Sequence, residues 1–212
     1  MLYIKKGKEP ASLTQYKKTA GANYDGCGKD DIKKSLMQEQ AGLCAYCMRR
    51  LHAPSEMRIE HDVSQSTSPK KALSYLNMLG VCYGGERNGG GHGKCRLTCD
   101  AHRGSRPLAV DPWDEASINK IKYMYDGTIY SEDHDINNDL HHTLNLNSDA
   151  GPHKKSREQV LWAFIGQLET KFGKSTSWNK ARLEKKRKEL LDENPKRSYC
   201  GILIWFLNKH IK

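Results

Sequence analysis

The chain has 212 residues, of which 37% are hydrophobic and 28% charged, and its formal net charge is +10. Its longest apolar run, residues 202–207, is far too short to cross a bilayer, and the N-terminal MLYIKKGKEP lacks the apolar core of a secretory signal. We therefore expect a cytoplasmic protein that has no membrane partner. A chain this basic favours an anionic partner, with nucleic acid as the first candidate, although an inert basic surface would carry the same charge.

The first half of the chain predicts one helix and two strands. Residues 31–41 are expected to form a short helix, which Asp30 can cap and Gly42 ends. The apolar pattern of residues 57–63 predicts a strand, and residues 75–82 contain the returning strand.

A polar connection precedes the second strand and a glycine-rich one follows it. Residues 69–76 predict a helical turn that begins at Pro69. Residues 84–93, GGERNGGGHG, are mostly glycine and predict a flexible loop. A phosphate-binding loop is excluded there, because Asn88 and Cys95 occupy the positions of its first glycine and its Ser or Thr.

The second half predicts a hairpin followed by helices. Residues 120–131 alternate around an Asp-Gly dipeptide, which favours a hairpin with a tight type I′ turn. Residues 179–191 predict a charged helix, and residues 199–207 a buried closing helix or strand, with a partner interface as the alternative. Between the hairpin and the charged helix, an amphipathic helix is indicated by apolar residues at every fourth position, namely Val160, Phe164, Leu168 and Phe172.

The cysteines indicate a metal site. The chain contains seven, which are Cys27, Cys44, Cys47, Cys82, Cys95, Cys99 and Cys200. An odd number without a secretory signal argues against a disulfide framework. Cys44 and Cys47 have the Cys-x-x-Cys spacing of a zinc knuckle, which supplies half of a tetrahedral site. The other half must come from two of Cys82, Cys95 and Cys99. A thiol–disulfide enzyme is the weaker alternative, since it requires a helix that starts between the paired cysteines.

A histidine between two carboxylates is a candidate general base. Glu60, His61 and Asp62 follow one another on the first predicted strand. An imidazole with an ordinary pKa near 6.5 can accept a proton from water at neutral pH. A surface histidine in a salt bridge is the alternative. Among the basic residues near this site, we expect Lys94, Arg103 and Arg106 to contact phosphate, although a solvated face fits nearly as well.

The order of these motifs resembles the HNH nucleases, whose core is a ββα-metal unit clamped by zinc knuckles. The resemblance extends to their PtuB subfamily, the nuclease component of Septu and some retron anti-phage systems. It is carried by LCAYC, RIEH, SYLNMLGVC, CDAHRG, AVDP, YMYDGTI and LNLN, which lie within residues 4–165. The last forty or so residues resemble the subfamily less.

The resemblance implies a role for each matching residue. His61 matches the general base, and Asn77 matches the residue that holds the catalytic loop or orients the histidine. Glu60 stands where the wider group often has an aspartate metal ligand. The structural zinc ligands would be Cys44, Cys47, Cys82 and Cys99. Asp100 is the preferred ligand of a catalytic Mg²⁺ or Mn²⁺, and His102 is its competitor.

Together these features predict an α+β fold. A zinc-knuckled ββα-metal core over residues 44–110 would carry an added hairpin and helical extensions. Residues 1–43 would form the N-terminal helical extension, and residues 111–212 the hairpin and a mainly helical region packed on the core.

The function that the resemblance implies is metal-assisted hydrolysis of phosphodiester bonds in a bacterial anti-phage complex. The partner would be a PtuA-like ATPase related to the ABC and SMC families, in some systems with a retron reverse transcriptase and its RNA–DNA product. DNA is the favoured substrate, and RNA, including tRNA, is the alternative. A non-catalytic zinc-knuckle module that binds nucleic acid is the second functional hypothesis.

Overall fold

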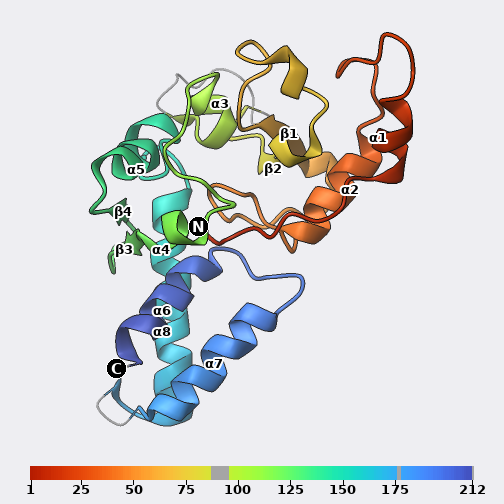
Figure 1. Ribbon diagram of the computed structural model, residues 1–212. Helices are drawn as coiled ribbons and strands as arrows, with labels where there is room; N and C mark the ends of the chain where they lie inside the picture. The colour runs from red at the N-terminus through yellow and green to blue at the C-terminus, as the bar shows by residue number, and fades with distance from the viewer. Residues whose placement is uncertain (87–95, 176–177, 212) are drawn as a thin grey trace.

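The computed structural model describes residues 1–86, 96–175 and 178–211 (Figure 1). The helices are α1 (Ala11–Tyr16), α2 (Asp30–Glu39), α3 (Cys99–Arg103), α4 (Glu115–Asn119), α5 (His134–Asn138), α6 (His153–Phe172), α7 (Lys180–Asp192) and α8 (Cys200–His210). The strands are β1 (Met57–His61), β2 (Met78–Cys82), β3 (Ile121–Tyr123) and β4 (Ile129–Ser131). Single turns are η1 (Pro54–Glu56), η2 (Pro69–Lys71), η3 (Tyr75–Asn77) and η5 (Asp139–Thr143). The protein is therefore a mixture of helices and small sheets, as the sequence predicts at this level.

The strands β1 and β2 form an antiparallel pair in which Ile59 lies opposite Gly80. A Cβ atom at position 80 would lie 2.6 Å from the Cε of Met57, so the Met57 side chain would have to shift to admit it. Gln40 follows α2, and its side chain donates to the Gly80 carbonyl (2.6 Å) and accepts from the Gly80 N–H (2.7 Å). The end of α2 is thus fastened to the free edge of β2.

Two boundaries differ from those predicted. The N-cap residue of α2 is Lys29, so Asp30 does not cap the helix but lies in its first turn, where its charge still complements the helix dipole. The first strand ends at His61, two residues earlier than predicted, because the Asn77 side chain binds both the N–H and the C=O of Val63.

The hairpin β3–β4 is confirmed, but its predicted type I′ turn is wrong. That turn needs a positive φ at Asp126, and only Gly127 (φ 82°) has one. The Met124 N–H donates to the Thr128 carbonyl, and the Gly127 N–H donates to the Met124 carbonyl, which defines a longer turn with a glycine bulge. A Cβ atom at Gly127 would lie 2.1 Å from the Lys154 carbonyl of α6, so the tip of the hairpin packs directly on that helix.

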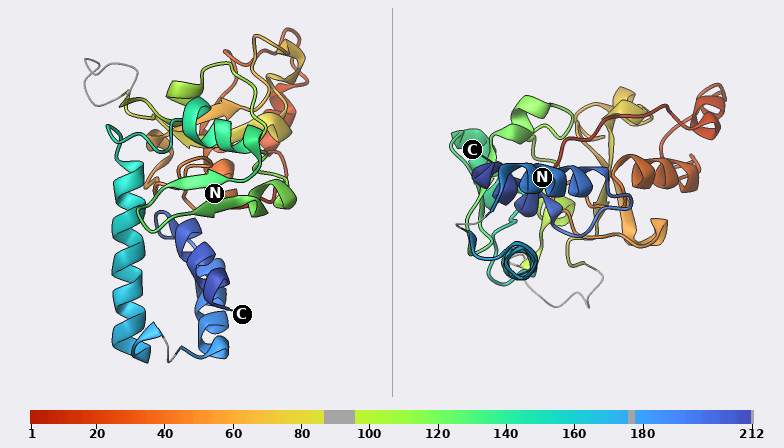
Figure 2. Two further views of the ribbon diagram at one scale, coloured as in Figure 1. Left: turned by 90° about the vertical axis from the view of Figure 1, so that its left-hand side faces the viewer. Right: turned by 90° about the horizontal axis from the view of Figure 1, so that it is seen from below.

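The three C-terminal helices form a group at the opposite end of the molecule from α1 (Figures 1 and 2). The amphipathic helix is confirmed and starts earlier than its predicted apolar pattern, at His153. The closing segment is a helix, and its apolar side chains, including Leu203 and Phe206, are buried within the chain. No helix in the described ranges is long and apolar enough to span a membrane.

Candidate functional site

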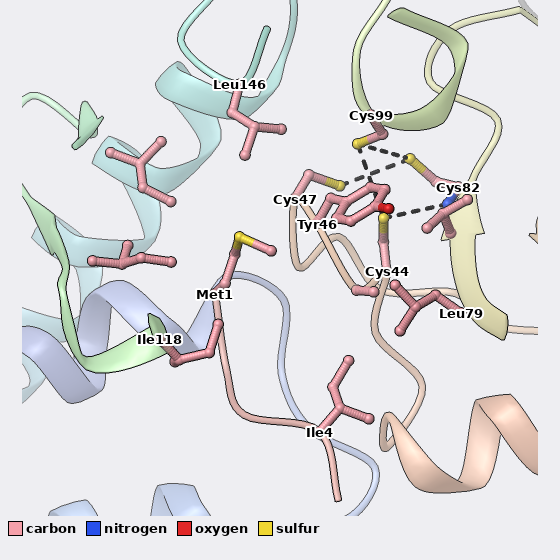
Figure 3. Close-up of a cluster of buried hydrophobic side chains, with 14 of the residues drawn as sticks. Met1, Ile4, Cys44, Tyr46, Cys47, Leu79, Cys82, Cys99, Ile118 and Leu146 are labelled. Carbon is pink, nitrogen blue, oxygen red and sulfur yellow. Dashed lines mark hydrogen bonds between the residues drawn. The ribbon is translucent and has the colours of Figure 1, made fainter. Parts of the chain in front are cut away.

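Four cysteine thiols from three separate segments meet in the buried core (Figure 3). Cys44 and Cys47 lie on the turn after α2, Cys82 ends β2, and Cys99 starts α3. All four Sγ atoms lie within 4.8 Å of one another. The separation is 4.0 Å between Cys44 and Cys99, 3.8 Å between Cys47 and Cys82, and 3.7 Å between Cys82 and Cys99.

These separations fit a tetrahedral metal site, since zinc–sulfur bonds of about 2.3 Å place sulfur atoms about 3.8 Å apart. Backbone donors also point at two of the sulfur atoms. The Cys82 N–H lies 3.3 Å from the Cys44 Sγ, and the Arg49 N–H lies 3.5 Å from the Cys47 Sγ. Met48, with φ at 64°, follows the two cysteines, and its N–H donates to the Cys44 carbonyl (3.0 Å), which closes the turn. The four cysteines could therefore hold a metal such as zinc.

The redox alternative fits this geometry poorly. The segment between Cys44 and Cys47 is a turn and not the start of a helix, and both thiols contact cysteines from other segments. Cys95, the competing ligand, lies outside the described residues. Cys82, the alternative to Cys95, is one of the four clustered cysteines.

His61 lies at the end of β1 with only 6% of its surface exposed. Its Nε2 is 2.9 Å from the Ala72 carbonyl oxygen, and its Nδ1 is 3.4 Å from the amide nitrogen of Gln65. A carbonyl can only accept, so Nε2 carries the hydrogen and Nδ1 is the basic nitrogen. The Tyr24 ring packs edge-to-face on the imidazole at 4.6 Å. Burial lowers the pKa of His61, which keeps the imidazole neutral at physiological pH.

An open cavity of about 250 Å³ lies beside this histidine. Its lining residues come from β1, the loop after it and α3, and they are Ile59, Glu60, His61, Ser64, Gln65, Asp100, Gly104 and Ser105. Three of the predicted site residues, Glu60, His61 and Asp100, are therefore brought together here. Asn77 and His102 do not line this cavity.

Glu60 is buried and paired with an arginine. Its Oε1 accepts from the Arg103 guanidinium and lies 3.4 Å from the Tyr46 hydroxyl. Burial is the main cause that raises the pKa of Glu60, and the nearby Asp100 carboxylate adds to it, while Arg103 opposes the shift. The net effect raises the pKa of Glu60 to about 8, and the ion pair with Arg103 stabilises its charged form.

Asp100 lies in the first turn of α3, and 14% of its side chain is exposed. Its Oδ2 is 3.0 Å from an Arg58 nitrogen, and the other end of that guanidinium pairs with Glu86. Asp100 and Glu60 line the same cavity, and the Asp100 carboxylate contributes to the raised pKa of Glu60. Two adjacent carboxylates on an open cavity are suitable oxygen ligands for Mg²⁺ or Mn²⁺.

Asn77 holds the loop that follows β1 and does not contact the imidazole. Its amide donates to the Val63 carbonyl (2.9 Å) and the Lys71 carbonyl (3.3 Å), and its Oδ1 accepts from the Val63 N–H (2.8 Å). This loop carries Ala72, whose carbonyl fixes the His61 ring. Of the two roles that the resemblance implies for Asn77, the contacts correspond to holding the loop.

His102 lies on α3 but faces away from the cavity. Its Nδ1 is 3.1 Å from the Thr143 carbonyl oxygen of η5. Successive residues on a helix are turned by about 100°, so positions 100 and 102 point in nearly opposite directions and cannot both face one cavity. The geometry therefore separates the two candidate ligands and favours Asp100.

The prediction that Arg103 contacts phosphate is wrong, because it is 2% exposed. Its guanidinium also donates to the Tyr46 hydroxyl (2.9 Å) and the Arg106 carbonyl (2.7 Å), so it joins α3 to β1 and the knuckle. No local pattern in the sequence marks this role. Arg106 keeps an exposed side chain that binds backbone carbonyls of His102 and Thr143, and Lys94 lies outside the described residues.

Comparison with known proteins gave no assignment. No family model matches the chain, and no curated protein matches it.

Proposed function

We propose that this chain is a metal-dependent endonuclease of the HNH type, with His61 as its general base. The observation that carries the proposal is the placement of His61. Its Nε2 is held by a backbone carbonyl, so Nδ1, which has the Gln65 amide nitrogen at 3.4 Å, is the basic nitrogen, and the residue lines a cavity together with two carboxylates. A binding module has no use for a neutral, oriented imidazole at such a place.

The proton transfer follows from this tautomer. With Nε2–H bound to the Ala72 carbonyl, Nδ1 of His61 can take a proton from a water molecule in the cavity. The water oxygen then attacks the phosphorus atom, and the bond from phosphorus to the leaving oxygen breaks. The Ala72 carbonyl remains a suitable acceptor when the ring becomes an imidazolium, so it favours the charged product of the transfer.

The carboxylates would hold the catalytic metal. A Mg²⁺ or Mn²⁺ ion bound by Asp100 with help from Glu60 would stabilise charge on the phosphate and on the leaving oxygen. Arg103 favours the ionised form of Glu60 and joins its strand to α3, while Asn77 holds the loop that orients the imidazole. These two are positioning residues, because neither reaches the cavity.

The PtuB resemblance extends the proposal to a biological setting. The chain would be the nuclease of a two-component anti-phage complex with an ATPase partner in the bacterial cytoplasm. The apolar side chains of α8 give little support to docking through this helix, because most of them are buried within the chain.

One observation favours the second hypothesis, a zinc module that binds nucleic acid without cutting it. Each of the two carboxylates already has an arginine partner, Arg58 for Asp100 and Arg103 for Glu60. A metal ion must compete with Arg58 for the Asp100 oxygens. Binding with a steep salt dependence and no cleavage would favour this hypothesis.

The test is cleavage of supercoiled plasmid and of total tRNA with Mn²⁺, by the full chain alone and with its ATPase partner. The His61→Ala variant should lose about 10²–10⁴-fold in rate, the typical contribution of a general base, and keep its structural metal. His52→Ala, which removes an exposed histidine, is the matched control and should cut normally. A His61→Ala protein that cuts like the wild type would refute the proposal.

A further inference from the structure

Arg157 on α6 is a buried cation that has no acidic partner within the described part of the chain. It is 2% exposed. Its guanidinium donates to the carbonyls of Gly127 (2.6 Å) and Leu146 (2.9 Å) and to the side-chain oxygen of Asn147 (2.9 Å), all of which are neutral. Its NH1 nitrogen is buried and has no hydrogen-bond partner among the described residues. A buried charge that lacks a counterion is costly, so a negative group is expected nearby.

Among the ionisable groups around Arg157, the cysteine cluster is the one that can supply the negative charge. Burial lowers the pKa of Arg157, and the ionisable groups that oppose this shift are Tyr123, Tyr199, Cys47 and Cys99. Burial raises the pKa values of both tyrosines well above neutrality, so they carry no charge. The thiols of the cluster are the remaining groups that can become negative, which they do when they bind a metal.

The backbone connects Arg157 to the cluster by short routes. The Cys99 N–H donates to the Leu144 carbonyl, and the carbonyl of Leu146, two residues later, accepts from Arg157. One turn earlier on the same face of α6, His153 binds the hydroxyl of Thr98, the residue before Cys99. Burial lowers the pKa of His153 to about 4, so this histidine is neutral and Arg157 is the cation of that face.

We propose that Arg157 is the counterion of the metal-bound cysteine cluster, so that metal binding and the packing of α6 stabilise each other. A divalent metal with four thiolates has a net charge of −2, and a permanent cation held nearby offsets part of it. This inference requires that the four cysteines bind a metal, and it is independent of any nuclease activity.

The test is a zinc competition titration with a chelator on the full chain. Arg157→Met keeps most of the length of the side chain and removes its charge. It should weaken zinc binding about 10–100-fold, the usual cost of losing a residue that supports a metal ligand. Arg157→Lys keeps the charge but loses the forked hydrogen bonds, and it should recover most of the affinity. Lys155→Met removes an exposed cation from the same helix and should bind zinc like the wild type.

A second titration separates charge from packing. Cys47→His lowers the charge of the loaded cluster from −2 to −1, and in this background Arg157→Met should cost less zinc affinity than in the wild type. The proposal is overturned if Arg157→Met binds zinc normally, if Met and Lys at this position are equally harmful, or if the cost of Arg157→Met is unchanged by Cys47→His. Zinc binding serves as the readout, so a chain that never cuts nucleic acid can still pass this test.

Discussion

The cysteine cluster and the cavity beside His61 share α3 and use opposite strands of one pair, β2 for the cluster and β1 for the cavity, yet they differ in kind. The cluster is closed: its four thiols are almost inaccessible and face one another. The cavity is open, and one of its carboxylates, Asp100, is held by the partly exposed Arg58, which a ligand could displace. Neighbouring elements can thus combine a rigid metal clamp, the cysteine cluster, with an open cavity whose ligands can exchange. Breaking the clamp should destroy the fold, whereas changes at the cavity should leave the fold intact.

The largest effect is expected from the clamp itself. Cys99→Ser, or removal of the metal with a chelator, should unfold the core. Zinc binding contributes about 10–16 kcal/mol in small structural sites, and the net stability of a domain is only about 5–15 kcal/mol. Thermal melting and metal content measure this. Cys27→Ser, outside the cluster, should retain the metal, and a Cys99→Ser protein that melts cooperatively with one metal per chain would contradict the clamp.

The next effect concerns the ligand of the catalytic metal. Asp100→Asn should lower the cleavage rate by on the order of 10²-fold, because a metal supplies several kcal/mol of charge stabilisation. His102→Ala should cut normally, since His102 binds the Thr143 carbonyl away from the cavity. Calorimetric titration with Mn²⁺ should show weaker binding for the first variant only. The reverse pattern would reassign the site to His102.

Asn77→Ala should have a smaller effect on both stability and rate. It leaves the N–H and C=O of Val63 without their side-chain partners, which costs about 1–3 kcal/mol of unfolding free energy. Cleavage should also slow, because the loop that carries Ala72 loosens. Chemical denaturation measures the first effect, with Thr67→Ala on the exposed part of the loop as a near-neutral control. Metal content should not change in either variant.

The smallest effect is a shift in pH dependence. Burial lowers the pKa of His61, so the neutral, active form persists as the pH falls, and kcat/KM should drop only below pH 6.5. Tyr24→Ala removes a ring that shields the imidazole and should move this acidic limb upward. A pH–rate profile of both proteins decides the point. An unshifted limb in Tyr24→Ala would show that the ring does not tune the histidine.

The part of the molecule that could be predicted from the sequence is the part set by local spacing. The knuckle at Cys44 and Cys47, the strand that carries His61 and the hairpin all follow from residue patterns a few positions long. The ligand pair Cys82 and Cys99 could be named because a tetrahedral metal site requires four ligands, and the resemblance selected these two.

Contacts between distant segments could not be predicted. Arg103 is read as a surface cation in the sequence, because nothing near it reveals Glu60 and Tyr46, some forty to sixty positions earlier. The same is true of Arg157, whose partners lie on the hairpin and on the segment before α6. Asp100 is already preferred to His102 at the sequence level, and the direction of α3 adds the geometric reason.

The close approach of Gly127 to the backbone of α6 has a practical consequence. In sequence, an Asp-Gly hairpin tip looks like a permissive place to insert an epitope tag or attach a dye. Here it is an internal joint, and any enlargement would lift the hairpin from the helix and remove the carbonyl that receives the Arg157 guanidinium. Labels for studying this protein therefore belong elsewhere. Tolerance of an insertion at this tip would measure how strongly the hairpin packs on α6.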